Sequence, residues 1–257
     1  MNSLEYRTPK GLGLVVFKQG SVGTLVTPGL GAADFTSSNP QPHPLYETIH
    51  DQFKDSTLVL TNPHQPLSRD KEREAIDIES QAHDIAHTIS SLSTGSQSRH
   101  WRLIGHSIGC MSILAALPLL PKDTSIDYIG IAPPTVDSLK DHQERLVDYY
   151  SRQGRQPADI HPSKPTIFRS LEDTKIIVTP KYWQSLERYD ILRNLDLLNT
   201  TQQASFVLIS QDSLYRTDAR TIKDLNRHAT VHTIKGKSHA FNDPAMLPQL
   251  SSTLDRL

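Results

Sequence analysis

Short apolar runs recur along this chain, separated by segments whose apolar residues follow a helical spacing, and this alternation limits the fold more than any other feature. Most of the runs are continuously apolar rather than alternating, which is typical of strands buried on both faces of a mainly parallel sheet. The runs are Leu12–Phe17, Gly23–Thr27, Thr57–Thr61, Trp101–Gly105, Tyr128–Ala132, Ser205–Ser210 and Thr230–Lys235.

The segments between these runs predict helices. They are Lys71–Ile89, Ile108–Leu120, Thr221–Arg227 and Pro244–Arg256. Ile108–Leu120 is apolar on nearly all sides, which indicates a buried helix. Strands that alternate with helices predict an α/β fold with a mostly parallel central sheet flanked by helices.

Residues 133–203 interrupt the alternation. A structureless loop of that length is implausible in a compact domain, and Val136–Ser151 and Pro180–Leu198 have helix-like patterns. We therefore expect a core domain of residues 1–132 and 204–257, with a helical cap formed by residues 133–203. The aromatic side chains of this insertion either pack the cap's own small core or line a substrate pocket beneath it.

Composition excludes several classes of protein. Lys and Arg total 27 and Asp and Glu total 28, for a net charge of −1, so we expect no nucleic-acid partner. Cys110 is the single cysteine and cannot form an intramolecular disulfide. Met1–Lys10 lacks an apolar segment, and the longest apolar stretch is too short to span a bilayer. We expect a cytoplasmic protein without a signal peptide or membrane span, and the oligomeric state stays open.

One short motif carries chemistry. Gly105-His106-Ser107-Ile108-Gly109 matches the pattern G-x-S-x-G, follows an apolar run and opens the apolar helix. Strand, sharp turn and helix in that order form the setting in which a nucleophilic serine is displayed. The flanking glycines remove side chains that would collide with the neighbouring strand and helix. Ser107 is therefore the candidate nucleophile.

A serine nucleophile needs a histidine base, and in this arrangement the base follows the acid along the chain. Three histidines follow Ser205–Ser210: His228, His232 and His239. His228 ends a predicted helix and His232 lies within a predicted strand. His239 lies in a loop beyond a strand end, where catalytic groups usually occur. We favour His239 as the base.

The acid that orients the base is expected just past the preceding strand. Asp212 follows Ser205–Ser210 directly and leaves room for one helix and one strand before His239. Asp137, beyond the strand that ends at Ala132, is the alternative.

An oxyanion intermediate needs two preorganised N–H donors. The backbone N–H of Ile108, next after the nucleophile, is the first candidate. The second is the N–H of Leu30 in the loop Pro28-Gly29-Leu30-Gly31, which follows an early strand. Gly29 or Gly31 could serve instead.

Taken together, these motifs resemble those of the α/β-hydrolase superfamily. The resemblance extends from about Leu14 to the C-terminus and rests on Pro28-Gly29-Leu30-Gly31, Gly105-His106-Ser107-Ile108-Gly109, Gln211-Asp212 and Ser238-His239. The chain has Pro28-Gly29 where members commonly have His-Gly. The resemblance implies a capped α/β-hydrolase fold with catalytic Ser107, Asp212 and His239, an oxyanion hole from Leu30 and Ile108, and no metal or organic cofactor.

The same resemblance implies a serine hydrolase that cleaves a carboxylic ester or thioester of a small molecule through an acyl-enzyme. Two alternatives remain. An acyltransferase or cyclase would pass the same acyl-enzyme to another nucleophile, and a cap that excludes water would favour it. A non-catalytic ligand receptor would retain the triad as part of a binding pocket.

Overall fold

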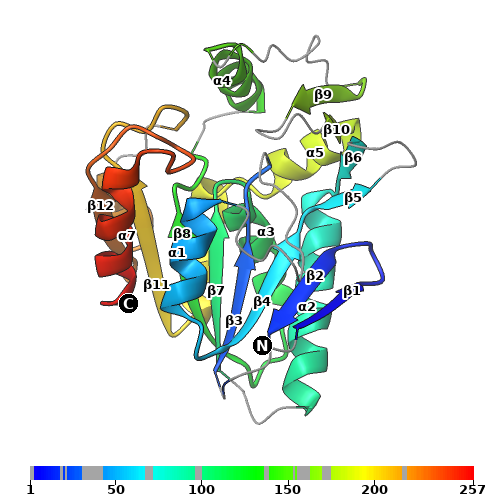
Figure 1. Ribbon diagram of the computed structural model, residues 1–257, viewed down its shortest axis with the longest axis vertical. Coiled ribbons are helices and arrows are strands. Elements are labelled where there is room, and N and C mark those ends of the chain that lie inside the picture. The colour runs from blue at the N-terminus through cyan, green and yellow to red at the C-terminus, as the bar shows by residue number, and fades with distance from the viewer. Residues whose placement is uncertain are drawn as a thin grey trace.

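An eight-stranded sheet runs through the molecule in the order β1-β2-β4-β3-β7-β8-β11-β12 (Figure 1). The pairs β1–β2 and β2–β4 are antiparallel, and every other neighbouring pair is parallel. The strands are β1 (Ser3–Arg7), β2 (Gly13–Phe17), β3 (Gly23–Thr27), β4 (Thr57–Asn62), β7 (His100–His106), β8 (Ser125–Ile131), β11 (Gln203–Ile209) and β12 (Thr230–Ile234). The predicted mostly parallel α/β sheet is confirmed.

The structure is a computed structural model. It describes residues 3–17, 20, 22–30, 43–66, 72–95, 100–135, 139–152, 154, 163–169, 175–215 and 219–257.

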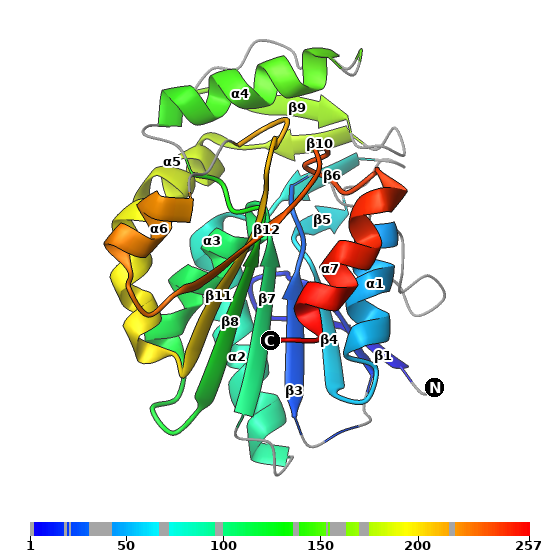
Figure 2. The same ribbon diagram turned by 90° about the vertical axis from the view of Figure 1, so that its left-hand side faces the viewer.

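Helices cover both faces of the sheet (Figure 2). Helices α1 (Pro44–Gln52) and α7 (Leu247–Leu254) pack on one face, and α2 (Ile78–Gly95), α3 (Gly109–Ala116) and α6 (Ala219–Leu225) pack on the other. Successive strand residues point to opposite faces. In β7, for example, Leu103 enters the core beneath α2 and α3, whereas its neighbour Ile104 enters the core beneath α1 and α7.

The insertion contains more than the predicted helices. It holds α4 (Leu139–Arg152), β9 (Thr166–Arg169), β10 (Lys175–Val178), α5 (Pro180–Arg188) and the 3-10 helix η2 (Leu192–Thr200). The two strands join β5 (His64–Pro66) and β6 (Glu72–Ala75) in a second sheet of order β5-β6-β10-β9. The insertion is therefore hydrogen-bonded to a segment between β4 and α2, and the sequence did not predict this link.

The predicted helix over Lys71–Ile89 is wrong at its start, because Glu72–Ala75 is a strand and the helix begins at Ile78. The carboxylate of Asp77 accepts the backbone N–H of Ser80 at 3.0 Å, the contact of a helix N-cap. The strand forms instead because β6 finds partners on both sides, β5 and β10.

The other helix predictions hold, with 3-10 turns added. Ile108–Leu120 contains α3 and η1 (Leu117–Leu119), and Pro244–Arg256 contains η3 (Pro244–Met246) and α7.

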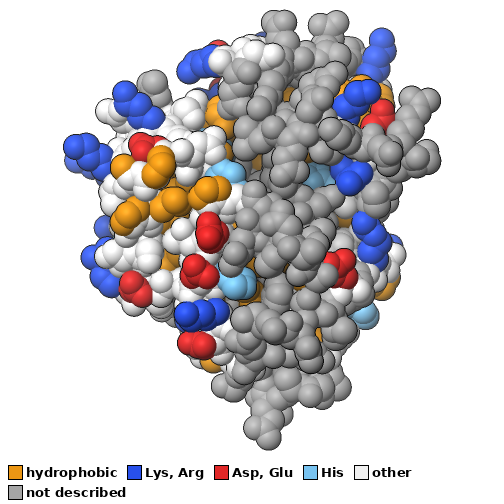
Figure 3. All heavy atoms as spheres, in the orientation of Figure 1, with side chains coloured by type: hydrophobic (Ala, Val, Ile, Leu, Met, Phe, Trp, Pro, Cys, Tyr) orange, Lys and Arg blue, Asp and Glu red, His pale blue; other side chains and the backbone are white. Residues whose placement is uncertain are grey.

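The carboxyl ends of β3, β7, β11 and β12 meet at one edge of the sheet, and α4 lies above this edge (Figure 1). In open α/β sheets, ligands bind at this edge. On the face shown in Figure 3, basic and acidic side chains are interspersed among the described residues. Within the described ranges, no helix is long and apolar enough to cross a membrane.

Candidate active site

Ser107 occupies a sharp turn between β7 and α3. Its φ is 52°, the left-handed region that non-glycine residues rarely adopt. A Cβ on Gly105 would lie 2.5 Å from the Cα of Cys110, and a Cβ on Gly109 would lie 2.1 Å from the carbonyl oxygen of Thr27. Only glycine fits at either position, which explains why the motif needs both glycines in order to hold the serine in this strained turn.

Ser107, His239 and Asp212 come together at the carboxyl edge of the sheet. Ser107 Oγ lies 2.8 Å from His239 Nε2, and His239 Nδ1 lies 2.9 Å from one carboxylate oxygen of Asp212 and 3.1 Å from the other. All three residues are buried. A hydroxyl, an imidazole and a carboxylate in this order form the arrangement that activates a serine.

Hydrogen bonds join the loop that carries Asp212 to the loop that carries His239. The Ser213 N–H donates to the Lys237 carbonyl at 2.9 Å, and the His239 N–H donates to Ser213 Oγ at 3.3 Å. Asp212 Oδ1 also accepts the N–H groups of Leu214 and Tyr215, at 2.7 and 3.0 Å. The carboxylate is thus held both by its own loop and by the imidazole, which fixes its direction.

The loop that carries Leu30, the second predicted oxyanion donor, lies beside the serine. A Cβ on Gly29 would lie 3.1 Å from Ser107 Cβ, so the loop after β3 passes directly against Ser107. Within the described part of the chain, no group accepts the backbone N–H of Ile108 or of Leu30. The N–H of Gly29, by contrast, donates to the Tyr46 hydroxyl at 3.3 Å. Gly31, the other alternative, lies outside the described residues.

A second buried histidine, His106, adjoins the serine. Its Nδ1 lies 2.9 Å from the Tyr46 hydroxyl and its Nε2 lies 3.1 Å from the His239 carbonyl oxygen. Burial, with a contribution from His239, lowers the pKa of His106 to about 3. The sequence analysis assigned no role to Tyr46 or His106. The one available signal was the place of His106 immediately before Ser107.

Aromatic residues of the insertion, and of the loop after β11 that carries Asp212, lie close to His239. The ring centroids of Tyr215 and Tyr149 lie 5.2 and 6.3 Å from that of His239. His142 of α4 stacks on Tyr215, with a centroid distance of 5.5 Å. Burial lowers the pKa of His142 to about 3. Two of these three residues, His142 and Tyr149, belong to the insertion, so α4 contributes directly to the surroundings of the site.

A cleft of about 940 Å³ separates α4 from the loop that carries Asp212. Its wall includes Arg145, Asp148 and Arg152 on the α4 side, and Asp212 and Lys237 on the core side. Both arginines are paired with acids on their own helix. The cleft therefore borders the triad on the side of its acid.

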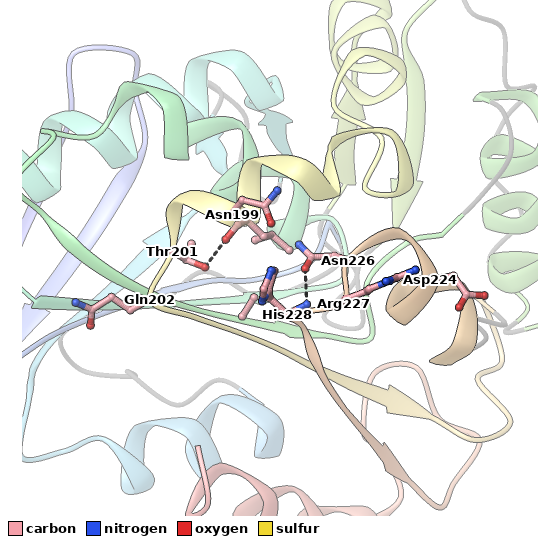
Figure 4. A pocket seen from close by; sticks show the side chains of 9 residues that line it. Asn199, Thr201, Gln202, Asp224, Asn226, Arg227 and His228 are labelled. Atoms are coloured by element: carbon pink, nitrogen blue, oxygen red, sulfur yellow. Dashed lines mark hydrogen bonds between the residues drawn. The ribbon is translucent and has the colours of Figure 1, made fainter.

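The alternative base candidates lie elsewhere. His228 lines a second pocket of about 550 Å³ at the opposite end of β11, together with Asn226 and Arg227 (Figure 4). In that pocket the backbone N–H of His228 donates to the Asn226 side chain at 3.0 Å. His232 lies within β12. Asp137, the alternative acid, lies outside the described residues.

Cys110 is fully buried, and burial raises the pKa of its thiol to about 12, so it behaves as a small apolar side chain. Among the described residues, no group of three or more His, Cys, Asp or Glu side chains is placed to hold a metal ion.

No protein-family model matches the sequence, and comparison with curated protein sequences gives no match. Solved structures match almost the whole chain. The esterase domain of a Rhodothermus marinus protein is 13% identical, with a TM-score of 0.64 over 99% of this chain and 96% of that one. Est1E from Butyrivibrio proteoclasticus, with ferulic acid bound, is 11% identical, with a TM-score of 0.66 over 98% and 96%.

The α/β hydrolase GrgF from Penicillium sp. sh18 is 17% identical, with a TM-score of 0.59 over 99% of this chain and 98% of that one. At these identities the likeness concerns the fold. Together with the strand order and the turn at Ser107, it shows that this chain has the α/β-hydrolase fold.

Proposed function

We propose that this protein is a serine hydrolase that cleaves a carboxylic ester or thioester of a small molecule through an acyl-enzyme. The observation that carries the proposal is the 2.8 Å contact between Ser107 Oγ and His239 Nε2, with Asp212 at the opposite ring nitrogen. A serine hydroxyl is a poor nucleophile at neutral pH, and an imidazole held against it can take its proton. The esterases among the structural neighbours support this substrate class.

In the proposed reaction, Ser107 Oγ adds to the carbonyl carbon while its proton passes to His239 Nε2. Asp212 stabilises the imidazolium, and the N–H groups of Ile108 and Leu30 donate to the oxyanion. The bond to the leaving group then breaks, and the leaving group takes the proton from His239. Water adds to the acyl carbon as His239 removes its proton, and Ser107 departs with that proton.

We further propose that residues 133–203 act as a cap over this site, with residues 1–132 and 204–257 as the core. The closeness of Tyr149 to His239 supports this, as does the cleft between α4 and the Asp212 loop. In such an arrangement the cap would select the acyl group or the leaving group.

The test is turnover of 4-nitrophenyl esters and acyl thioesters of increasing chain length, with acid-quenched samples read by intact mass. We expect wild type to hydrolyse at least one substrate and to carry the mass of one acyl group, and Ser107→Ala to do neither. Parallel reactions with an alcohol acceptor separate hydrolysis from acyl transfer by their products. Retained turnover in Ser107→Ala, or a folded wild type that no substrate acylates, would show the proposal to be wrong.

A further inference from the structure

A chain of hydrogen bonds connects the loop after β3 with the loop that carries His239. It begins at the Gly29 N–H, passes through the Tyr46 hydroxyl at 3.3 Å, and reaches His106 Nδ1 at 2.9 Å. His106 Nε2 then contacts the His239 carbonyl oxygen at 3.1 Å. The four residues come from four segments that are distant in sequence and meet behind Ser107.

The direction of each hydrogen bond follows from its partners. A carbonyl oxygen only accepts, so His106 Nε2 carries the proton that the His239 carbonyl receives. The buried ring is neutral, which leaves Nδ1 as an acceptor. Burial also raises the pKa of Tyr46, so its hydroxyl remains protonated and donates to Nδ1. The Tyr46 oxygen accepts the Gly29 N–H.

This chain determines which N–H of the loop is available to an oxyanion. The Gly29 N–H already donates to Tyr46, whereas the next N–H, on Leu30, has no acceptor in the described part of the chain. On its other side, the Leu30 carbonyl accepts a hydrogen bond from His64 Nε2 at 2.8 Å. The backbone is therefore held by a hydrogen bond on each side of the Leu30 N–H, at the Gly29 N–H and at the Leu30 carbonyl, and the loop lies against Ser107.

We propose that Tyr46 and His106 are positioning residues that hold the Leu30 N–H in register with Ser107, while the His239 carbonyl fixes His106 in the tautomer that accepts from Tyr46. The inference rests on the proposed function, because it assigns the Leu30 N–H to the oxyanion. Neither residue would touch the substrate. Their contribution would be preorganisation, since a donor must already be in place when the negative charge develops.

The size of the expected effect separates this role from a purely structural one. Loss of a whole oxyanion donor costs roughly 10²- to 10³-fold in kcat, so a donor that is displaced but present should cost about 10-fold. Tyr46→Phe keeps the buried ring and removes only the hydroxyl, at the cost in stability of leaving the Gly29 N–H and His106 Nδ1 without this partner. Tyr46→Phe should therefore fold, lose about 10-fold in kcat and keep its KM.

The decisive readout is affinity for an inhibitor that places an oxygen in the oxyanion hole, such as a boronic acid or a trifluoromethyl ketone. We expect Tyr46→Phe to weaken this inhibitor by the same factor as kcat and to leave a ground-state product analogue unaffected. If Tyr46 only stabilised the fold, the active fraction would fall while both inhibition constants stayed at wild-type values. That result would overturn the proposal.

His106 allows its two hydrogen bonds to be removed one at a time. In His106→Gln, the side-chain amide nitrogen can still donate to the His239 carbonyl, but the acceptor for Tyr46 is lost. In His106→Asn, the amide oxygen can replace Nδ1, but the bond to His239 is lost. We expect His106→Gln to lose kcat and affinity for the oxyanion mimic to the same extent as Tyr46→Phe. The double variant should lose little more than either single variant. His106→Asn should keep the affinity for the oxyanion mimic.

Failure of the positioning proposal differs from failure of the proposed function. Wild-type kinetics in Tyr46→Phe and His106→Gln, with Ser107→Ala inactive, would overturn the positioning role alone. Equal activity in wild type and Ser107→Ala would overturn the function. Independently of activity, ¹H–¹⁵N spectra of the histidine rings in wild type should show His106 as the neutral Nε2–H tautomer from pH 8 to pH 5. The Nδ1–H tautomer, or a ring that titrates in this range, would overturn the hydrogen-bond chain even if the variants do not fold.

Discussion

In the described part of the chain, two Ser–His–Asp trios lie at opposite edges of the same sheet. The Ser107 trio (Ser107, His239 and Asp212) lies at the carboxyl ends of the parallel strands. The Ser125 trio lies at their amino ends, where His100 Nδ1 is 2.8 Å from Ser125 Oγ and His100 Nε2 is 2.8 Å from Asp127. By hydrogen-bond distances alone, the two trios are nearly equal.

Their backbones differ. Ser125 faces His100 as an ordinary cross-strand pair within the β7–β8 ladder. The neighbouring backbone groups therefore form the hydrogen bonds of the sheet. Ser107 lies outside the ladder with a φ of 52° at the start of α3; Ile108 follows it in the chain, and the loop that carries Gly29 and Leu30 lies against it. A nucleophilic site thus requires donors for the developing charge as well as a base.

Their exposure also differs. The side chains of His100 and Asp127 are 34% and 16% exposed, against 5% and 3% for His239 and Asp212. Water therefore competes for the hydrogen bonds of the Ser125 trio and weakens its electrostatic interactions. The Ser125 trio serves as an internal control for the Ser107 trio.

The largest predicted contrast is between the two serines. Ser107→Ala should lower kcat for the best ester substrate by at least about 10⁴-fold, because both the nucleophile and the acyl-enzyme are lost. Ser125→Ala should stay within about twofold of wild type, since surface changes of this kind perturb little. Steady-state kinetics on both purified variants checks this, and a large loss in Ser125→Ala would remove the distinction between the trios.

The next contrast is between the two acids. Asp212→Asn should lower kcat by roughly 10³- to 10⁴-fold, because the amide no longer stabilises the imidazolium and favours the wrong tautomer of His239. Asp127→Asn, the matched change in the Ser125 trio, should leave kcat unchanged. Comparable activity in the two variants would argue that His239 does not depend on Asp212.

A smaller contrast concerns the backbone beside Ser107. Gly29→Ala would place a methyl group 3.1 Å from Ser107 Cβ and 3.5 Å from His106 Nδ1. The loop must then shift by a few tenths of an ångström, and we expect kcat to fall about 10-fold with the oxyanion donor. Gly154→Ala is the control for backbone strain alone, because Gly154 is exposed and has a φ of 68°, and no atom lies within 4 Å of its added methyl group. Equal kinetics in the two variants would show that the loop can shift by this amount without loss of kcat.

The smallest expected effect is on the pH dependence of the free energy of unfolding. His106 and His142 are buried, and burial lowers the pKa of each to about 3, whereas in the unfolded chain the pKa is near 6.5. Between these values the unfolded state binds the protons, so the free energy of unfolding falls as the pH falls from 6.5 towards 3. Each histidine contributes up to about 1.4 kcal/mol per pH unit.

Urea denaturation from pH 7.5 to pH 4.5 measures this slope. His142→Gln should make the slope shallower by close to one proton, and adding His106→Gln should make it shallower again. A slope unchanged in both variants would mean that these rings are already protonated, or are exposed, in the folded protein.

The main features of the fold could be predicted from the sequence, for physical reasons. Buried parallel strands such as Trp101–Gly105 need continuous apolar runs, and these are visible in one dimension. Ser107 and Asp212 each follow such a run, His239 follows the alternating segment Thr230–Lys235, and the carboxyl ends of parallel strands share one edge. Their proximity therefore follows from the strand order.

The features that the sequence did not reveal depend on distant partners. The strands Thr166–Arg169 and Glu72–Ala75 are only four residues long, and each pairs with β10, which lies between them. Tyr46 lies on α1, a helix that the sequence analysis did not predict, and its hydroxyl acts through residues 17 and 60 positions away. No local pattern encodes such contacts, so the hydrogen bonds that hold the Gly29–Leu30 segment could be found only in the structure.

One measurement tests most directly the claim that Ser107 is an activated nucleophile. Wild type, Ser107→Ala and Ser125→Ala are treated with a fluorophosphonate and read by intact mass. We predict a single adduct on wild type and on Ser125→Ala, and none on Ser107→Ala. An adduct that persists in Ser107→Ala, or its absence from folded wild type, would contradict the assignment of Ser107 as the nucleophile.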